Sequence, residues 1–234
     1  MSGGLDSLVT AATAVAEGRE CAFRHVTYGQ RTAARERRAF EAICDFYEPY
    51  KRLVADIGYL AAIGGSALTD ERIPVPTADS AGAGRHGATE NAVPVTYVPF
   101  RNAHLVAIAT SLAEVEGAGE IYIGATQVDY SGYPDCRREF FDAFEKAIEV
   151  GTKPETYIRI VTPVINMTKA DIVREGMNLK APLELTWSCY TNSERACGAC
   201  ESCVLRLKGF AEAGVRDPVE YAYWPPEVAR HLIG

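Results

Sequence analysis

Residues 2–7 (SGGLDS) combine two adjacent glycines, two hydroxyls and a carboxylate directly ahead of an apolar stretch typical of a helix. Glycine lets the backbone approach a ligand without a Cβ collision, and a helix N-terminus presents unpaired N–H groups with a partial positive charge. The segment therefore predicts a cradle for a phosphate or pyrophosphate. It lacks the Lys-Ser/Thr pair of the Walker A loop, which argues against a kinase or GTPase that transfers a γ-phosphate. The alternative is a serine or aspartate that caps the first helix, with glycines that are only a flexible terminus.

A second group of chemistry-bearing residues, 129–137 (DYSGYPDCR), follows an apolar stretch at 120–125 (EIYIGA). Two aromatic rings, two carboxylates and an arginine can stack a flat heterocycle, accept hydrogen bonds from its N–H groups and clamp a carboxylate. The alternative is a tight Gly-Pro turn with surface tyrosines. Cys136 lies within this stretch, where its position allows a thioester role. Nothing in the sequence indicates a partner that lowers its pKa, so a structural role is favoured.

A third group consists of four cysteines in a C-x7-C-x2-C-x2-C pattern near the C-terminus. They are Cys189, Cys197, Cys200 and Cys203. Four thiolates can complete a tetrahedral Zn²⁺ shell, and such a closed shell predicts a structural metal rather than a catalytic one. An iron–sulfur cluster is the alternative. The remaining cysteines, Cys21 and Cys44, are expected to be small core residues.

Alternating helices and short apolar strands must position these groups. Helical spacing of apolar residues predicts helices over residues 7–17, 32–47, 103–116, 137–150 and 169–176, and strands are expected over residues 21–28, 51–56, 120–125 and 158–163. The alternation predicts an α/β fold with a doubly wound, mostly parallel sheet. Ligands bind such sheets at the carboxyl ends of the strands, where both the 28–31 and the 129–137 segments fall. We expect a nucleotide-binding domain over residues 1–180 and a small zinc-binding region over residues 181–234.

Composition and charge restrict the function further. The chain has 234 residues, 47% of them hydrophobic, with 24 basic and 31 acidic residues and a net charge of −7. This composition excludes a disordered chain and a coiled coil, and the acidic balance argues against a broad nucleic-acid surface. The longest apolar stretches are about half the roughly 20 residues that a membrane span needs, and no secretory signal is recognisable. We therefore expect a cytoplasmic protein that binds neither nucleic acid nor membrane.

The SGGLDS segment resembles the signature of the PP-loop ATP pyrophosphatases, which split ATP between its α- and β-phosphates and adenylate a carbonyl or carboxyl oxygen. Nearly the whole chain resembles the 7-cyano-7-deazaguanine synthase family of that superfamily. The segments that carry this likeness are residues 2–7 (SGGLDS), 28–31 (YGQR), 63–69 (IGGSALT), 95–99 (VTYVP) with 101–102 (RN), 129–137 (DYSGYPDCR), 184–190 (ELTWSCY) and the cysteine array. A collinear set of this kind is far more specific than any one motif.

The resemblance implies a PP-loop fold and a ligase that uses ATP and Mg²⁺ to convert 7-carboxy-7-deazaguanine and ammonia into 7-cyano-7-deazaguanine, in a chain that forms a homodimer. The implied ATP-binding residues are Ser2, Gly3, Gly4, Leu5, Asp6 and Ser7. The implied catalytic residues are Asp6, Ser7 and Arg101. The implied substrate-binding residues are Tyr28, Gln30, Arg101, Asn102, Asp129, Tyr130, Ser131, Gly132, Tyr133, Asp135 and Arg137.

Five residues near these segments have an alternative explanation in ordinary structure. Arg101 with Asn102 also suits a surface arginine followed by a capping amide. Lys169 is able to meet a phosphate, but a solvated helix face is the default expectation. Trp187 and Tyr190 are expected to pack against the cysteine knuckle rather than to line the pocket.

The phosphate loop has an unusual setting, because a nucleotide loop in a doubly wound sheet normally follows its own buried strand, and here the loop begins at residue 2. We expect the sheet to lack a central member, with unpaired backbone groups on the strands beside it. Two other functions remain possible on the sequence: a PP-loop enzyme that adenylates tRNA, and a zinc-stapled homologue that is non-catalytic or modifies a protein.

Overall fold

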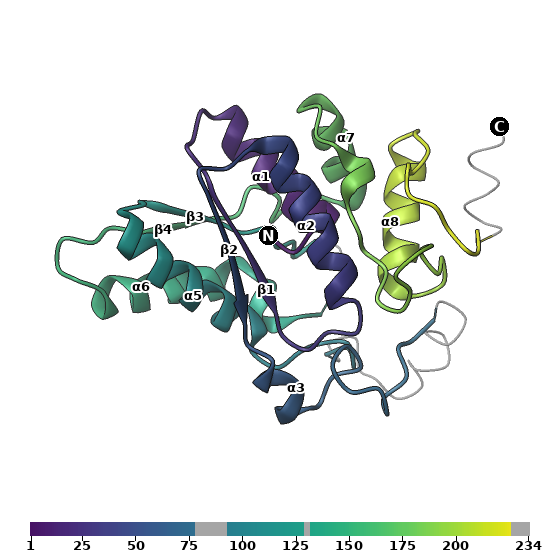
Figure 1. Cartoon of the computed structure of the whole chain (residues 1–234), viewed down its shortest axis with the longest axis horizontal. Helices are drawn as coiled ribbons and strands as arrows, with labels where there is room; N and C mark the ends of the chain where they lie inside the picture. Colours follow the sequence, from purple (N-terminus) through teal and green to yellow (C-terminus); the bar gives the residue numbers. More distant parts are fainter. Residues whose placement is uncertain (78–92, 129–131, 226–234) are drawn as a thin grey trace.

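Two pairs of parallel strands form the β structure of this computed structural model, which describes residues 1–77, 93–128 and 132–225 (Figure 1). Strand β1 (Ala22–Thr27) pairs in parallel with β2 (Lys51–Asp56), and β3 (Glu120–Tyr122) pairs in parallel with β4 (Arg159–Val161). Parallel neighbours require a crossover, and α2 (Ala33–Tyr47) and α6 (Arg138–Gly151) provide it for the two pairs. The α/β class with parallel strands is confirmed.

Further helices pack around the two strand pairs. Besides α2 and α6, they are α1 (Leu5–Ala16), α3 (Tyr59–Ile63), α5 (Arg101–Glu116), α7 (Lys169–Asn178) and α8 (Glu201–Glu212), with 3₁₀ turns η1 (Pro134–Cys136) and η2 (Leu183–Leu185). One core joins β1 with α1, α2, α7 and α8 through residues such as Leu8, Phe40 and Phe210. A second core joins β3 and β4 with α5 and α6, with Val106 and Phe141 at its centre. Each strand pair therefore has its own apolar core, and a further cluster packs Val26 of β1 against Leu105 of α5.

The single doubly wound sheet expected from the sequence is not what the described residues form. β1 and β3 belong to separate two-stranded sheets, and a cavity of about 870 Å³ lies between them. Phe23 and Val26 of β1 line one side of this cavity, and Ile121 and Ile123 line the other. Among the described residues, no strand lies between β1 and β3 to bridge their backbone groups.

The amino terminus lies beside β1, at the edge of this gap. The Met1 amino group donates to the carbonyl oxygen of Arg24, and His25 Nδ1 lies 3.1 Å from the Met1 carbonyl oxygen. Complete burial lowers the pKa of the amino group from its ordinary value of 8.0 to about 4, with a smaller contribution from the Arg24 charge. The amino group is therefore neutral at pH 7 in the folded chain.

This buried amino group predicts a pH dependence of stability. Between pH 4 and pH 8 the unfolded chain binds a proton that the folded chain does not, so the free energy of unfolding rises with pH. The expected slope is about 1.4 kcal/mol per pH unit from this group alone. Urea unfolding of the 234-residue chain from pH 5 to pH 8 measures the slope. The same chain with an acetylated amino terminus is expected to lose this contribution, and equal slopes for the two would contradict the prediction.

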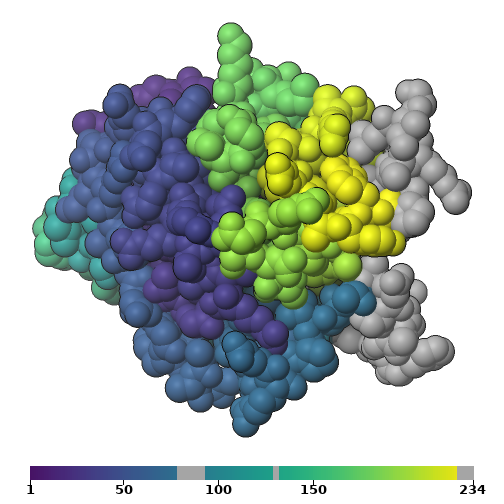
Figure 2. All heavy atoms as spheres, turned by 45° about the vertical axis from the view of Figure 1, so that its right-hand side comes forward, coloured from purple at the N-terminus to yellow at the C-terminus, as the bar shows by residue number. Residues whose placement is uncertain are grey.

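The C-terminal segment packs directly against the amino-terminal helices, as Figure 2 shows for its yellow-green and yellow surface beside the purple and blue one. Helix α8 contacts α7 along its length, and Phe210 of α8 belongs to the first core. The sequence did not predict α8. Its signal is the apolar spacing of Cys203, Leu207 and Phe210, which recurs at helical intervals after the cysteine pattern. In the described part of the chain, the helices are too short or too polar to cross a membrane.

Candidate active site

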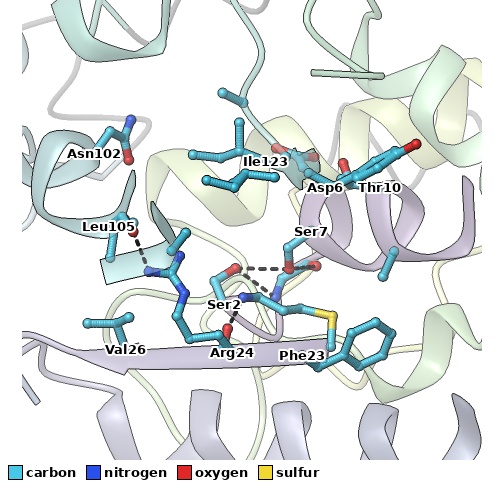
Figure 3. A pocket seen from close by; sticks show the side chains of 18 of the residues that line it. Ser2, Asp6, Ser7, Thr10, Phe23, Arg24, Val26, Asn102, Leu105 and Ile123 are labelled. Carbon is cyan, nitrogen blue, oxygen red and sulfur yellow. Dashed lines mark hydrogen bonds between the residues drawn. The ribbon is translucent and has the colours of Figure 1, made fainter. Parts of the chain in front are cut away.

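The phosphate-type loop turns directly into α1, and its serines fold back on it. Ser2 Oγ accepts a hydrogen bond from the Gly4 amide at 3.1 Å and lies 3.1 Å from Ser7 Oγ, which donates to the Gly4 carbonyl oxygen at 2.9 Å (Figure 3). Gly4 occupies the cap position of α1, and no side chain caps the helix there. The alternative of a serine or aspartate that merely caps α1 is therefore wrong. The first turn of α1 opens into the cavity between the strand pairs.

Close backbone packing holds this loop in place at two glycines. Gly3 has φ of +85°, and a Cβ there would lie 2.7 Å from the carbonyl oxygen of Glu36. Gly124, just after β3, would place a Cβ 2.7 Å from the carbonyl oxygen of Asp6. Trp187 fixes the loop from a third side, because its amide donates to the Gly3 carbonyl oxygen at 2.9 Å. Only glycine fits at both packed positions without moving the neighbouring backbone.

Lys169 and Asp6 form an ion pair at the N-terminus of α1. The Lys169 ammonium lies 2.8 and 2.7 Å from the two carboxylate oxygens, and the two side chains are 17% and 25% exposed. Lys169 is the first residue of α7, whose N-terminus is fixed by a capping box between Thr168 and Asp171. The expectation of a solvated lysine face is wrong at this position. The structure instead brings a positive charge to the phosphate-type loop.

A half-buried arginine among tyrosines forms another part of the cavity wall. Arg101 Nη1 donates to the Tyr28 hydroxyl at 3.1 Å, and its guanidinium carbon lies 5.1 Å from the centre of the Tyr28 ring. Tyr133 and Tyr190 line the same part of the cavity. Burial raises the pKa of Tyr28 to about 12, although Arg101 opposes this, so the hydroxyl stays protonated. The buried Arg101 Nε makes no hydrogen bond to the described part of the protein.

Asn102 and Asp135 bind each other and so fix the start of α5 next to η1. The Asn102 amide donates to Asp135 Oδ2 at 2.9 Å, and its side-chain nitrogen donates to the Asp135 carbonyl oxygen at 2.8 Å. The alternative of Arg101 as a surface residue is wrong, because the Arg101 side chain lines the cavity and donates to Tyr28. Burial, with Asp135 beside it, raises the pKa of Cys136 to about 11. The Cys136 thiol is thus neutral near pH 7, in accord with a structural role.

The cavity brings together most of the residues that the sequence predicts for the site. It is lined by Ser2, Gly4, Leu5, Asp6, Ser7, Tyr28, Arg101, Asn102 and Tyr133. Gln30 is buried beside it, where its side chain binds the Tyr28 amide and Glu36. The residues Gly3, Gly132 and Asp135 are likewise absent from the cavity wall. Arg137 is directed elsewhere and pairs with Glu139 at 2.8 Å. Asp129, Tyr130 and Ser131 lie outside the described residues.

Sequence reasoning missed Glu36 as a wall residue, and it favoured packing at the cysteine knuckle for Tyr190, which lines the cavity. Burial raises the pKa of Glu36, against the hydrogen bonds from Gln30 and Thr32. The sequence does contain a signal for Glu36, because this residue lies in the first turn of the helix that follows residues 28–31. Trp187 packs beside the cysteine cluster as expected, but it also lines the cavity, where its buried Nε1 makes no hydrogen bond to a described residue.

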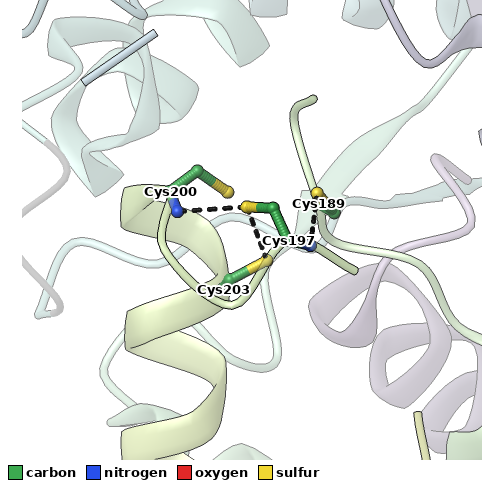
Figure 4. Close-up of side chains that lie close together, drawn as sticks. All are labelled: Cys189, Cys197, Cys200 and Cys203. Carbon is green, nitrogen blue, oxygen red and sulfur yellow. Dashed lines mark hydrogen bonds between the residues drawn. The ribbon is translucent and has the colours of Figure 1, made fainter. Parts of the chain in front are cut away.

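The four cysteine sulfurs gather where α8 begins, within 4.8 Å of one another (Figure 4). Cys197 and Cys203 Sγ are 3.8 Å apart, which matches the edge of about 3.8 Å of a tetrahedron with Zn–S bonds of about 2.3 Å. Backbone amides donate to Cys189 and Cys197 Sγ. Such N–H donors stabilise thiolates, which are the metal-ligand form of cysteine, so the donor set fits Zn²⁺.

Gly198 is required in this knuckle, which gives a testable prediction. Its φ is +76°, and a Cβ would overlap the carbonyl oxygen of Tyr223. Gly198→Ala is expected to lower the bound zinc content and to reduce the free energy of unfolding by about 3 kcal/mol. The matched control is Gly214→Ala, since Gly214 has the same φ of +76° with no atom within 4 Å. Zinc analysis and thermal melting measure both variants, and equal losses would contradict the steric explanation.

Parallel α/β architecture, a glycine loop at a helix N-terminus and a four-cysteine cluster together define the class, an α/β protein with an anion-binding loop and a C-terminal cysteine knuckle. A family model described as "Queuosine biosynthesis protein QueC" matches residues 1–214. The chain is 54% identical over 225 residues to the 7-cyano-7-deazaguanine synthase of Chlorobaculum parvum, with 96% of each chain covered. It is 51% identical over 222 residues to that of Campylobacter curvus, with 95% of this chain and 96% of the relative covered. The chain belongs to the QueC family.

Proposed function

We propose that the chain is an ATP-dependent ligase that converts 7-carboxy-7-deazaguanine and ammonia into 7-cyano-7-deazaguanine. The observation that carries this proposal is the shared cavity, whose wall includes both the N-terminus of α1 and Arg101 with its tyrosines. A phosphate chain and an aromatic carboxylate are the ligands that suit these two parts of the wall. The names of the relatives support the same activity.

ATP is proposed to bind with its phosphates at the N-terminus of α1. The Gly4 and Ser7 region supplies N–H groups and hydroxyls, and Lys169 supplies a positive charge next to them. The Asp6 carboxylate and the serine hydroxyls are the oxygen ligands that Mg²⁺ takes, so they would hold the metal that neutralises charge on the phosphates. These groups favour the transition state because negative charge grows on the leaving pyrophosphate.

The deazaguanine is proposed to bind between the tyrosines, with its carboxylate on Arg101. The unused Nε of Arg101 and its Nη atoms can donate two parallel hydrogen bonds to that carboxylate. Tyr28 and Tyr133 can stack on the flat ring system. The deazaguanine part of the site is proposed to be completed by Asp129, Tyr130 and Ser131. Gln30, Gly132, Asp135 and Arg137 are proposed to support the surrounding loop.

Two adenylations account for the product. The carboxylate oxygen attacks the α-phosphorus of ATP and releases pyrophosphate, and ammonia then displaces AMP from the acyl carbon to give the amide. The amide oxygen attacks a second ATP, and loss of AMP with two N–H protons leaves the nitrile. Both carboxylate oxygens therefore depart on AMP, and no step requires water. The chain's role is to hold carboxylate and α-phosphate in line while the cavity excludes water.

Oxygen labelling tests this assignment sharply. The protein is incubated with carboxylate-labelled [¹⁸O₂]-7-carboxy-7-deazaguanine, ammonium, ATP and Mg²⁺, without RNA. Mass spectrometry is expected to find the nitrile together with two molecules of AMP for each nitrile, each bearing one ¹⁸O. Label in inorganic phosphate, or AMP release that depends on added tRNA, would contradict the proposal. Omission of ammonium is the control, because it should stop nitrile formation.

The C-terminal cysteines are proposed to hold a structural Zn²⁺, which would fix the start of α8 with all four positions filled by sulfur. The division into a nucleotide-binding domain over 1–180 and a zinc-binding region over 181–234 is kept as a proposal. A homodimer is also proposed.

A further inference from the structure

Helix α8 connects the cysteine cluster to the phosphate-type loop, and we propose that Arg206 and Gly209 of this helix position that loop and Lys169 for ATP. The inference rests on the proposed function, because it assigns the support of the same ATP site. Both residues are positioning residues in this proposal and act through their neighbours. They lie three positions apart and therefore share one face of α8.

Arg206 ties α8 to the loop that precedes the cysteine cluster. Its side chain is 2% exposed, and its guanidinium binds Asp217 through Nε at 2.7 Å and Nη2 at 3.0 Å. On its other side Nη1 donates to Thr186 Oγ1 at 2.7 Å and to Ser188 Oγ at 3.2 Å. A buried charge whose hydrogen bonds are made on both sides holds its partners in one arrangement. The backbone between Thr186 and Ser188 is thus fixed relative to α8.

The residue between these two partners contacts the phosphate-type loop directly. The Trp187 amide donates to the Gly3 carbonyl oxygen at 2.9 Å, and a Cβ on Gly4 would lie 3.5 Å from the Trp187 carbonyl oxygen. A shift of residues 186–188 therefore moves the peptide groups at the N-terminus of α1. Those groups are the N–H donors that the phosphates would use. The chain of contacts runs from Arg206 through Trp187 to Gly3.

Gly209 provides a second connection, to the lysine of the site. A Cβ on Gly209 would lie 2.5 Å from Lys169 Cβ and 3.1 Å from the Lys169 carbonyl oxygen. The absence of a side chain at Gly209 lets α8 approach the first turn of α7 this closely. Because the Lys169 ammonium reaches Asp6, the position of α8 sets where that charge lies. Helix α8 thus supports the site at two independent points.

The first test separates the loop side of the Arg206 network from its far side. Thr186→Val removes, with little change in volume, the hydroxyl that accepts from Arg206 and donates to the Leu183 carbonyl oxygen. Tyr221→Phe removes the hydroxyl that donates to Asp217 at 2.7 Å. Isothermal titration with α,β-methylene-ATP and Mg²⁺ is expected to give a Kd about tenfold higher for Thr186→Val. Tyr221→Phe is expected to lower the melting temperature and to leave the Kd unchanged. If the Arg206 network only stabilises the fold, both variants should change the Kd and the melting temperature alike.

The second test applies the same logic to the glycine. Gly209→Ala is expected to raise the Kd for α,β-methylene-ATP by about tenfold and to lower kcat, because the new methyl displaces Lys169. Its matched control is Gly176→Ala in α7, where a Cβ would lie 2.8 Å from Leu183 Cδ2 and 3.0 Å from Val9 Cγ2. This control introduces crowding against side-chain atoms away from Lys169, so it should reduce the melting temperature without changing the Kd.

These outcomes distinguish a failure of the proposed function from a failure of the positioning role. If the unaltered protein does not bind the ATP analogue, the proposed function fails and the positioning role fails with it. If the unaltered protein binds the analogue and both Thr186→Val and Gly209→Ala bind it equally well, only the positioning role is overturned. A Kd that rises in these two variants and stays constant in Tyr221→Phe and Gly176→Ala supports it.

Discussion

Lys169→Met is expected to reduce kcat/KM for AMP release by about 10²–10³ while the protein stays folded. The ammonium lies on the Asp6 carboxylate at the N-terminus of α1, where the pyrophosphate would leave. Methionine keeps the length of the side chain and removes its charge, so the loss reports the electrostatic contribution. Steady-state AMP release with both substrates, together with thermal melting, measures the effect.

Lys208→Met is the matched control for this change. Lys208 also forms an ion pair with a carboxylate, that of Glu212 at 3.6 Å, but both side chains are at least half exposed on the outer face of α8. Exposed pairs of this kind contribute little to stability, and this one is far from the loop, so activity should be unchanged. A Lys169→Met enzyme with activity within threefold of the unaltered protein would show that the charge has no part in the reaction.

The sequence predicts the local elements well because helical and strand periodicities are local properties. The β2 strand at residues 51–56 is found where expected, and α1 differs from its predicted range by two residues at the start and one at the end. The cysteine pattern is also local, and all four sulfurs meet. The phosphate-type loop is recognisable because glycines and a helix start are adjacent in the chain.

Contacts between residues far apart in the chain could not be predicted from the sequence. Asn102 is close to Asp135 only because α5 and η1 pack together, and Lys169 meets Asp6 across 163 residues of chain. A lysine at the start of a helix is most often solvated, and for this reason the sequence predicts a solvent-exposed Lys169, which is wrong. Helix α8 was missed because the cysteine pattern dominated that region. Its role in packing depends on Gly209, whose importance is visible only when α7 lies beside it.

The gap between β1 and β3 leads to the second large effect, which concerns stability. Apolar side chains near both strand pairs line this gap, among them Phe23, Val26, Ile121 and Ile123. Met1 already lies alongside β1 through its contacts with Arg24 and His25. An extended segment joined ahead of Met1 would continue in the same direction, between the two edges. Its backbone can pair with both strands, and its side chains can fill the cavity.

A six-residue apolar segment rich in Val, Ile and Leu, joined ahead of Met1, is therefore expected to raise the free energy of unfolding. Conversion of the buried amino group into a peptide N–H alone removes about 1.4 kcal/mol of cost at pH 7, because its ordinary pKa of 8.0 lies one pH unit higher. Burial of the added side chains contributes about 1.5–3 kcal/mol for each one that becomes fully buried, offset in part by the ordering of the segment.

The matched control is a Gly-Ser segment of equal length, which also removes the terminal charge but offers no apolar side chains and no strand propensity. Urea unfolding and circular dichroism compare the three chains. The apolar segment is expected to give the highest stability and added β signal, because it joins the two sheets into one that holds the phosphate-type loop between them. If the two extensions have equal stability, the gap does not accept a strand.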